Sequence, residues 1–514
     1  MRPDGILESL SAAVGPEGLI TDPAECDFYA QDVYSKGPPP LAVIRPADKE
    51  ALARAVGAAT AAGVAIIPRG GGMSYTGGYV APKAGALIVD LGRMNRVLDI
   101  NPTDMTATVE AGCTWEDLRL ALKPHRLRAL AWGTLSGIKA TVGGGMSQNG
   151  VFWGARDGVV VDGALRFEVV LANGRIVSTG SDFFRPFGPD ITGLFAADTG
   201  AFGIKATVTL QLVREGAAFA YGSYAFDTAD GFFKAMSGVA REGLASESFG
   251  FDPFLQAQRM KRESLAKDAK SLVNMMKAQG SAWKALKEGA KVVAAGRSFL
   301  DDAGFSLHLI CEGRNEPAVA ADLAEIERIV ADAGGRVVEN SIPKILRANP
   351  FPPVNSMVGP AGERWVPVHG FLPHSRLLEG WNRIQALFEA NAAEMERLGV
   401  GAGAMLAAVS RSACLIEPVF FWPDNLEELH RRSIEPDHLA KLEQFPANEE
   451  SRALVAHLRG GLIETFRGLG ATHLQIARTY PLQEALDSSA WAILRTLKDA
   501  VDPDNLMNPG SLGL

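Results

Sequence analysis

Residues 68–78 read PRGGGMSYTGG and follow the apolar run Val64–Ile67, and a second glycine run occupies Thr141–Gly145. Consecutive glycines at the end of a strand let backbone N–H groups turn toward one point, because no Cβ atom obstructs them. A nest of such donors binds a pyrophosphate. One run alone could be a tight surface turn. Two runs in one chain favour a nucleotide-binding site.

The second glycine run stands in a stretch with its own strand and turn signals. It is followed by the polar patch Ser147–Asn149, and later by the apolar run Phe167–Ala172 and the turn pair Asn173-Gly174. An apolar run that ends in Asn-Gly is typical of a strand that enters a hairpin. We therefore predict a strand and a hairpin after the second run.

This order of segments resembles the flavin-binding domain of the vanillyl-alcohol oxidase and para-cresol methylhydroxylase (PCMH) superfamily. Three further segments match it: IRPADKEALARAVGAATAAGV at 44–64, FGPDITGLFAADTGAFGI at 187–204 and LKDAVDPDNLMNPGSLGL at 497–514. The resemblance covers residues 40–215 well and the C-terminal end moderately, while the middle of the chain matches loosely. It implies a two-domain PCMH-type fold that binds FAD.

Length and composition bound the fold. A chain of 514 residues with 47% hydrophobic content can form two or more domains with a large core. Residues 49–63 combine helix formers with an apolar stripe, and Gly63 is placed to end that helix. We further predict a helix at 115–122 and strands at 65–67, 86–90, 106–110 and 167–172. Together these elements indicate an α+β fold.

The pattern changes near Ala217. Strands are predicted at 218–226 and 304–311, separated by long helical stretches, and another helix at 316–333. We therefore predict three parts: a PCMH-type FAD-binding domain at 1–215, an α+β cap or substrate domain at 216–465, and a segment at 466–514 that returns to the FAD-binding domain. The cap sheet is expected to carry helices on one side.

Charge and targeting signals narrow the class of protein. The formal net charge of −8 argues against nucleic acid as a partner. The N-terminus at 1–18 has acidic residues and no apolar core of a secretory signal, and no run reaches the ~18 apolar residues of a spanning helix. We therefore expect a soluble, cytoplasmic protein. The cysteines are scattered and predicted to be buried free thiols, with no metal site: Cys26, Cys113, Cys311 and Cys414.

Residues 258–297 are a local charge anomaly. They hold ten Lys and Arg against three acidic residues, interleaved with Met and Trp. A solvated helical face explains this pattern, and a basic surface that docks on a membrane or on an acidic electron acceptor is the alternative. We also expect a homo-oligomer.

The resemblance implies a set of cofactor contacts. Arg69 and the run Gly70, Gly71, Gly72, Met73 and Ser74 would hold the FAD pyrophosphate, and the other contacts implied by matching motifs are Thr134, Gly137, Thr141, Gly144, Asn149, Gly150, Ile204 and Asn508. Many relatives attach the flavin through a histidine in the first motif, where this chain has Met73 and Ser74. We therefore predict noncovalent FAD, with His369, His374, Cys414 or a cap tyrosine as alternative attachment points.

The motifs that assign substrates in this superfamily are incomplete. The HxGDGNxH segment of metal-assisted D-2-hydroxyacid dehydrogenases is absent. Phenol oxidases of the superfamily place a tyrosine and an arginine before a Thr-His-Leu sequence. This chain has Thr472-His473-Leu474, but Gly470 and Ala471 stand at those two positions. Arg478 and Tyr480 are the alternative phenolate ligands.

The catalytic candidates follow from the chemistry of alcohol oxidation. Removing a hydride from an alcohol carbon needs a base for the hydroxyl proton, and histidine has the best matched unperturbed pKa. We predict His473 and His369 for this role, although a structural histidine is the more common case. Tyr480 could share the proton, and Arg411 and Glu417 are further candidates that more often pair structurally.

The sequence thus predicts an FAD-dependent oxidoreductase that oxidises a small, aromatic or otherwise hydroxylated alcohol by hydride transfer to flavin N5. Oxygen or a protein acceptor would reoxidise the flavin. The alternatives are a metal-independent D-2-hydroxyacid dehydrogenase, a flavin-adduct transferase resembling alkyl-glycerone-phosphate synthase, and a flavin-binding subunit that passes electrons to a partner.

Overall fold

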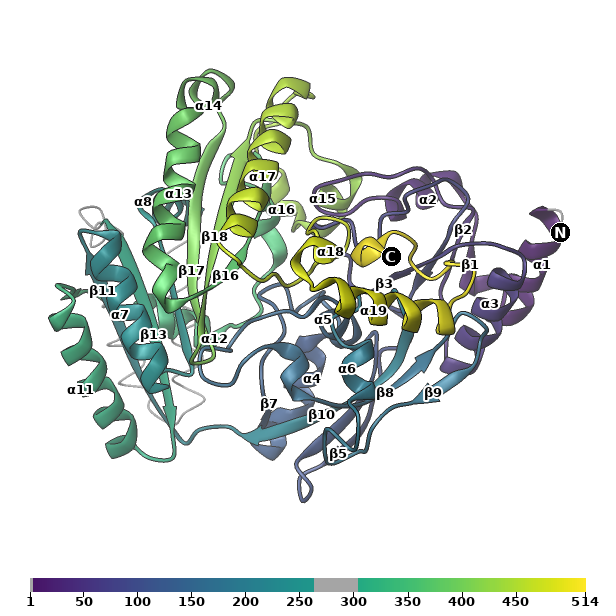
Figure 1. Cartoon of the computed structure of the whole chain (residues 1–514), viewed down its shortest axis with the longest axis horizontal. Coiled ribbons are helices and arrows are strands. Elements are labelled where there is room, and N and C mark those ends of the chain that lie inside the picture. Colours follow the sequence, from purple (N-terminus) through teal and green to yellow (C-terminus); the bar gives the residue numbers. More distant parts are fainter. Residues whose placement is uncertain (1–2, 263–303) are drawn as a thin grey trace.

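The computed structural model describes residues 3–262 and 304–514. Three β-sheets organise this part of the chain, and helices pack on them (Figure 1). The basic segment at 258–297 lies outside the described residues except for its start, which ends helix α8 (Pro253–Arg262).

The first sheet carries the first glycine run. Its order is β1–β2–β4–β3, with β1 (Leu19–Ile20), β2 (Ala42–Ile44), β4 (Leu87–Asp90) and β3 (Ile66–Arg69). Strands β2, β4 and β3 are parallel and buried, as expected for a sheet covered on both faces. Helices α1 (Pro3–Val14) and α3 (Lys49–Ala61) share one core with it, and α2 (Pro23–Tyr29) packs in another.

The second sheet is antiparallel and carries the second glycine run. Its order is β5 (Val97–Asn101), β6 (Thr106–Glu110), β10 (Ile204–Arg214), β8 (Ala164–Val170) and β9 (Ile176–Ser178), and β7 (Leu127–Ala129) also pairs with β10. Its core includes side chains of α4 (Trp115–Leu122), α5 (Val142–Gln148) and α6 (Ile191–Phe195). The glycines of the second run form most of α5, whose N-cap is Thr141.

The third sheet, here called the cap sheet, has eight antiparallel strands. Its order is β14–β11–β13–β12–β17–β18–β15, and β16 also pairs with β18. The strands are β11 (Ala218–Phe226), β12 (Glu247–Phe251), β13 (Phe305–Gly313), β14 (Arg336–Val337), β15 (Arg364–Pro367), β16 (Gly370–Pro373), β17 (Gly401–Val409) and β18 (Ala413–Trp422).

The two faces of the cap sheet have different partners, because side chains alternate along a strand. One face packs in a core with helices α7 (Ala229–Glu242), α11 (Glu316–Asp332), α13 (Leu377–Ala390), α14 (Ala392–Leu398) and α17 (Glu449–Gly468). These helices line the outer side of the molecule (Figure 1). The other face, which carries Phe249 and Phe251 of β12, has its own apolar cluster.

The C-terminal segment runs back to the first two sheets. The N–H of Ile66 in β3 donates to the carbonyl of Leu506 at 2.7 Å, and the N–H of Asn508 donates to the carbonyl of Ile66 at 2.8 Å. The Asn508 side-chain amide also donates to the carbonyls of Gly78 and Thr199, at 2.8 and 2.6 Å. Helices α18 (Leu482–Ala485) and α19 (Ser488–Val501) precede this contact. Asn508 thereby ties the chain end to the first glycine run.

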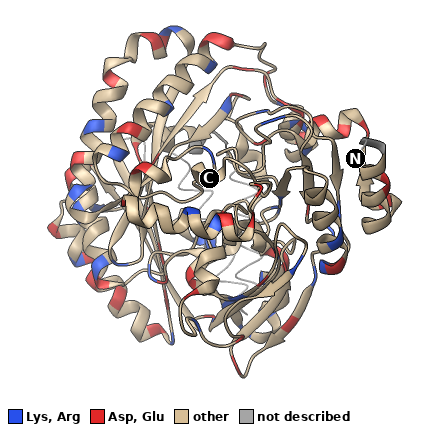
Figure 2. Ribbon diagram, turned by 45° about the vertical axis from the view of Figure 1, so that its right-hand side comes forward, with Lys and Arg blue, Asp and Glu red and all other residues tan. Residues whose placement is uncertain are grey.

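The remaining helices lie between the cap sheet and the rest of the chain. They are α12 (Ser341–Ala348), the short 3₁₀ helix η5 (Val354–Met357), α15 (Glu428–Ser433) and α16 (Pro436–Leu439). Acidic and basic residues are interspersed along the outer helices (Figure 2). Several pair one turn apart, such as Arg383 with Glu379 at 2.6 Å. Within the described ranges, no helix combines the length and the apolar character needed to cross a bilayer.

The structure confirms the α+β class and several elements predicted from the sequence. The strand at 106–110 and the helix at 115–122 have the predicted bounds, and β8 and β9 form the predicted hairpin. The strand predicted at 304–311 extends instead over Phe305–Gly313. All four cysteines are buried and free, as predicted.

Candidate functional site

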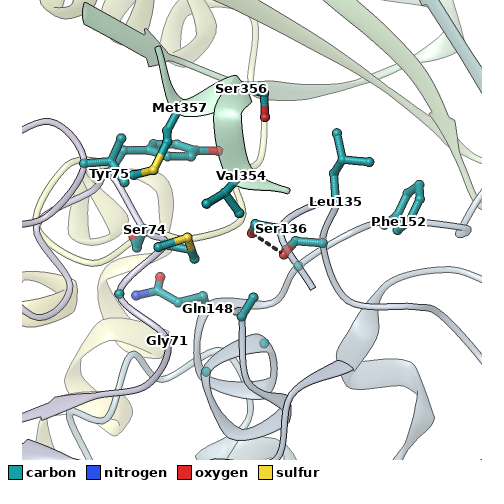
Figure 3. A pocket seen from close by; sticks show the side chains of 18 of the residues that line it. Gly71, Ser74, Tyr75, Leu135, Ser136, Gln148, Phe152, Val354, Ser356 and Met357 are labelled. Atoms are coloured by element: carbon teal, nitrogen blue, oxygen red, sulfur yellow. Dashed lines mark hydrogen bonds between the residues drawn. The ribbon is translucent and has the colours of Figure 1, made fainter. Parts of the chain in front are cut away.

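A cavity of about 1280 Å³ lies between the two glycine runs and the cap sheet. That volume exceeds the ~300–1,000 Å³ of usual small-molecule pockets. Figure 3 shows Val354 and Met357 of η5 on one side of it, and Gly71 and Gln148 on the other. The cavity has room for a large cofactor together with a small substrate.

The first glycine run packs closely against the segment that holds the second at the cavity wall. A Cβ atom on Gly70 would lie 2.5 Å from the Thr141 hydroxyl, and one on Gly71 would lie 1.9 Å from the carbonyl oxygen of Lys139. Gly72 adopts φ +70°, a conformation that favours glycine. Side chains at Gly70 and Gly71 would therefore push the two segments apart.

Polar atoms in this wall lack partners within the described residues. The side-chain oxygens Oε1 of Gln148 and Oγ1 of Thr199 are buried without a hydrogen bond, and both residues line the cavity. A Cβ on Gly144 would meet only the Thr141 hydroxyl, at 3.0 Å, so Gly144 faces open space. Unsatisfied buried groups beside a glycine-lined surface fit a polar ligand with close backbone contacts, such as a dinucleotide.

Arg69 stands where β3 enters the first glycine run. Its guanidinium carbon lies 4.6 Å from the ring centroid of Tyr29, 5.3 Å from that of Phe28 and 5.5 Å from that of Tyr79. Arg69 is buried, and its Nε has no hydrogen-bond partner in the described part of the chain. The aromatic rings hold a cation at the cavity wall, where it suits an anionic ligand.

Most of the predicted cofactor residues line the cavity. These are Arg69, Gly70, Gly71, Gly72, Met73, Ser74, Thr134, Thr141, Gly144, Gly150 and Ile204. Three others lie next to it: Gly137 packs on the ring of Phe351, Asn149 ends α5 with φ 56°, and Asn508 holds the chain end. Their contacts with FAD stay predictions.

The predicted catalytic histidines form a buried cluster with Tyr480, apart from the residues that line the cavity. His369 Nε2 donates to the carbonyl of Leu474 at 2.8 Å, and the Tyr480 hydroxyl donates to His369 Nδ1 at 3.2 Å. His473 Nδ1 donates to the carbonyl of His369 at 2.7 Å, and the His473 ring stacks on Tyr480 at 4.1 Å.

Burial shifts the pKa values of His369, His473 and Tyr480 so that all three side chains stay uncharged. Burial lowers the pKa of His369 to about 3 and also lowers the pKa of His473. Burial raises the pKa of Tyr480. Both nitrogens of His369 are occupied, so its hydrogen bonds favour a structural role, although proton transfer by either histidine stays a prediction to be tested.

The other two catalytic candidates belong to the hairpin of β17 and β18. Arg411 follows β17 in the turn toward β18, and its carbonyl accepts from His374 Nε2 at 3.0 Å. Glu417 lies within β18 and lines the cavity. Burial, together with the charge of Glu417, holds the pKa of Tyr75 well above its usual value. The structure therefore brings Glu417, but not Arg411, to the cavity.

The cap sheet supplies an apolar wall with two acidic groups. Besides Trp365 and Ala408, its residues on the cavity are Glu247, Phe249, Phe251, Met405, Ala407, Leu415 and Glu417. The register places Met405 opposite both Phe251 and Glu417, so these side chains share one face. We call this set the cap face.

Basic side chains reach the cavity from elsewhere in the described residues: Arg69, Lys205 and Lys441. Lys205 is neutralised by Asp198, whose Oδ1 accepts from Nζ at 2.6 Å. Arg69 belongs to the first glycine run, and Lys441 follows α16. Among described residues, the cap face therefore contributes no cation to the cavity.

Glu247 is a site residue that the sequence analysis did not identify. It begins β12 and is 6% exposed, and burial raises its pKa to about 8. The sequence does contain a pattern that places Glu247 with the aromatic residues, because Glu247, Phe249 and Phe251 alternate with Ser248 and Gly250. An acid in phase with the aromatic side of a buried strand lies on the same face as those rings.

Comparison with known families matches both ends of the chain. The family model described as "FAD binding domain" matches residues 40–180, and that described as "FAD linked oxidases, C-terminal domain" matches residues 450–512. These matches fall on the two glycine runs and on the segment that returns to them. They identify FAD as the cofactor of this fold.

Curated relatives align over the same region. The chain is 32% identical over 211 residues to the glycolate oxidase subunit GlcD of Bacillus subtilis, which is 40% of this chain and 44% of that protein. It is 31% identical over 212 residues to a D-2-hydroxyglutarate dehydrogenase of Xanthomonas citri, which is 41% of this chain and 44% of that protein. The match thus spans less than half of these relatives.

Solved structures share the whole fold. A p-cresol methylhydroxylase with bound substrate superposes with a TM-score of 0.72 at 16% identity, covering 99% of this chain and 96% of the other. An alkyldihydroxyacetonephosphate synthase superposes with a TM-score of 0.70 at 15% identity, covering 98% of this chain and 84% of the other. The resemblance to the PCMH-type fold, inferred from the glycine runs, is confirmed.

Proposed function

We propose that this protein is an FAD-dependent oxidoreductase that oxidises the CH–OH group of a small aromatic alcohol, either uncharged or cationic. The observation that carries this proposal is the composition of the cap face, which is apolar and aromatic and bears Glu247 and Glu417. Bound FAD would supply the hydride acceptor. The chain's own residues hold the substrate, exclude water and take the hydroxyl proton.

Aromatic side chains surround the substrate end of the cavity. The rings of Tyr75 and Trp365 meet edge to face at 5.6 Å, and those of Phe249 and Phe251 lie 5.8 Å apart. All four residues line the cavity. Such rings favour a flat apolar substrate through edge-to-face and offset contacts.

The lack of a cation on the described cap strands argues against an anionic substrate. A substrate carboxylate there would find no described Lys or Arg of the cap face to pair with it. An unpaired carboxylate is costly to bury. A 2-hydroxyacid is therefore disfavoured, although the names of the curated relatives support it as the second candidate.

Anaerobic flavin reduction tests the proposal. The protein is mixed with an aryl alcohol, with its aminomethyl and carboxyl derivatives, and with glycolate and D-2-hydroxyglutarate. We expect the oxidised flavin bands to bleach with the neutral and aminomethyl alcohols and to bleach much more slowly with the carboxylates. Faster bleaching by a 2-hydroxyacid would favour the second candidate.

Bleaching by none of these compounds would instead point to the two non-oxidising alternatives, a flavin-adduct transferase or an electron-transfer subunit. The acceptor that reoxidises the reduced flavin is part of the proposal. Oxygen consumption during turnover distinguishes an oxidase from a dehydrogenase that needs a protein acceptor. A homo-oligomer, and docking through residues 258–297, stay predictions for sedimentation and binding measurements.

A further inference from the structure

Glu247 begins β12, a central strand of the cap sheet, where a buried acidic side chain needs an explanation. Strand β12 is flanked by β13 and β17, and Glu247 pairs in register with Ile310 of β13. Its neighbours on the cap face are Phe249 and Phe251. A carboxyl group among aromatic rings in a central strand contributes nothing to packing that a leucine would not.

The polar contacts of Glu247 come from the segment that follows the second glycine run. The backbone N–H groups of Gly154 and Trp153 lie near its carboxyl group and favour its ionised form. The oxygen Oε2 is buried and has no hydrogen-bond partner among the described residues. The carboxyl group therefore lies beside the segment after the second glycine run.

Leaving a buried carboxyl oxygen unsatisfied costs stability, so such groups concentrate at functional sites. The histidine cluster differs on this point. His369 uses both ring nitrogens in hydrogen bonds to Leu474 and Tyr480, and it is not among the residues that line the cavity. Glu247, in contrast, lines the cavity.

We propose that Glu247 is the catalytic base, which takes the substrate's hydroxyl proton as the hydride leaves the carbinol carbon. The O–H proton would go to the carboxylate of Glu247, the C–H bonding pair would go to the bound flavin, and the alcohol would become a carbonyl, so atoms and electrons balance. Reoxidation of the flavin by oxygen or a protein acceptor completes the cycle. This role rests on the proposed alcohol oxidation.

The test compares Glu247→Gln with Ser248→Ala. Glutamine keeps the size of the side chain and an acceptor oxygen for the N–H groups of Trp153 and Gly154, but it cannot take the proton. Ser248 is the next residue of β12, its side chain points to the opposite face, and it does not line the cavity. Both variants should keep the fold and the FAD absorbance.

Single-turnover flavin reduction is the first measurement. Loss of a general base typically slows a reaction ~10²–10⁴-fold. We expect that loss in Glu247→Gln and a near wild-type rate in Ser248→Ala. Equal rates in Glu247→Gln and the wild type, with an alcohol that bleaches the wild type, would overturn the role of Glu247 and leave the proposed function standing.

An infrared pH titration of the FAD-loaded protein is the second measurement, and it needs no turnover. A buried protonated carboxyl gives a C=O band that disappears as the group ionises. The band of Glu247 is the one that disappears near pH 8, because the pKa of Asp252 is raised to only about 6. We expect this band in the wild type and in Ser248→Ala, and its loss in Glu247→Gln. The same band in Glu247→Gln would contradict the proposal. A wild-type protein that no alcohol bleaches would overturn the proposed function, and with it this role.

Discussion

Gly71 lies against Lys139 so closely that a Cβ atom on the glycine would stand 1.9 Å from the lysine's carbonyl oxygen. This contact joins the first glycine run to the segment that leads into the second. Gly144 is different, because a Cβ there would meet only the Thr141 hydroxyl at 3.0 Å and would otherwise project into the cavity. The two glycines therefore serve different purposes, one in packing and one in leaving room for the cofactor.

Valine substitutions at these glycines should separate the two purposes. Gly144→Val should fold but lose most of its FAD, because its side chain occupies cofactor space. Gly71→Val should lower the melting temperature as well, since overpacking a close backbone contact typically costs ~1–3 kcal/mol. The measurements are flavin absorbance per chain and thermal unfolding. Gly460→Val is the control, because Gly460 has nothing within 4 Å of its added Cβ. Full flavin content in Gly144→Val would show that this surface is an ordinary turn.

The flavin should be released when the protein is denatured. Met73 and Ser74 line the cavity where many relatives have a linking histidine, and neither is an expected flavin linker. The alternative linkers His374 and Cys414 contact each other, with Sγ of Cys414 3.7 Å from Nδ1 of His374. Acid precipitation should leave all yellow colour in the supernatant. Flavin fluorescence that stays with the precipitate on a denaturing gel would show a covalent bond instead.

Alanine substitutions at the histidines decide between two proton acceptors. If Glu247 is the base, His369→Ala should lower stability by ~1–3 kcal/mol, because it strips the buried Tyr480 hydroxyl of its acceptor. His473→Ala should lose the stacking on Tyr480. Both variants should then reduce their flavin at near wild-type rates. A ~10²–10⁴-fold slower reduction in either one would restore the histidine as the base.

The sequence predicted local structure well where backbone chemistry determines it. The Asn173-Gly174 turn and the amphipathic segment at 49–63 each carry their own signal, and each forms the expected element. The second glycine run instead forms most of helix α5, which the sequence did not predict. The C-terminal return was predicted from the match at 497–514, and Asn508 makes its contacts there.

The cap face was harder to predict, because it depends on which strands become neighbours in the sheet. Glu247, Met405 and Glu417 are brought onto one face by the pairing of β12, β17 and β18. No local pattern encodes that pairing order. The histidines were predicted as bases from the unperturbed pKa of the imidazole group. Their burial beside Tyr480, which lowers that pKa, also depends on tertiary contacts.

Stability should fall with pH because of Glu247. Burial raises its pKa from 4.5 to about 8, so the folded state binds a proton that the unfolded state has lost between these values. The stabilising contribution is complete below pH ~4.5 and disappears as pH rises through ~8. With ~1.4 kcal/mol per pKa unit, the effect is at most ~5 kcal/mol. Unfolding by urea from pH 5 to 9 should show a steeper loss in the wild type than in Glu247→Gln. Parallel pH curves would contradict the buried, protonated carboxyl.

The same ionisation should raise the rate of flavin reduction with pH. A base works only as the carboxylate, so the wild-type rate should climb until pH reaches about 8 and then level off. The ionisable groups near Glu247 are paired or neutral. Glu312 and Asp157 pair with Arg128, and Asp157 also pairs with Arg156. His308 is uncharged, because burial lowers its pKa to about 3. Asp252, which follows β12, has its pKa raised by burial to only about 6, so a step near pH 8 should belong to Glu247. Stopped-flow reduction from pH 5 to 10 should show it in the wild type and in Ser248→Ala, and a flat, slow profile in Glu247→Gln. If the step survives in Glu247→Gln, another group titrates in the cavity, and Glu417 is the next residue to replace.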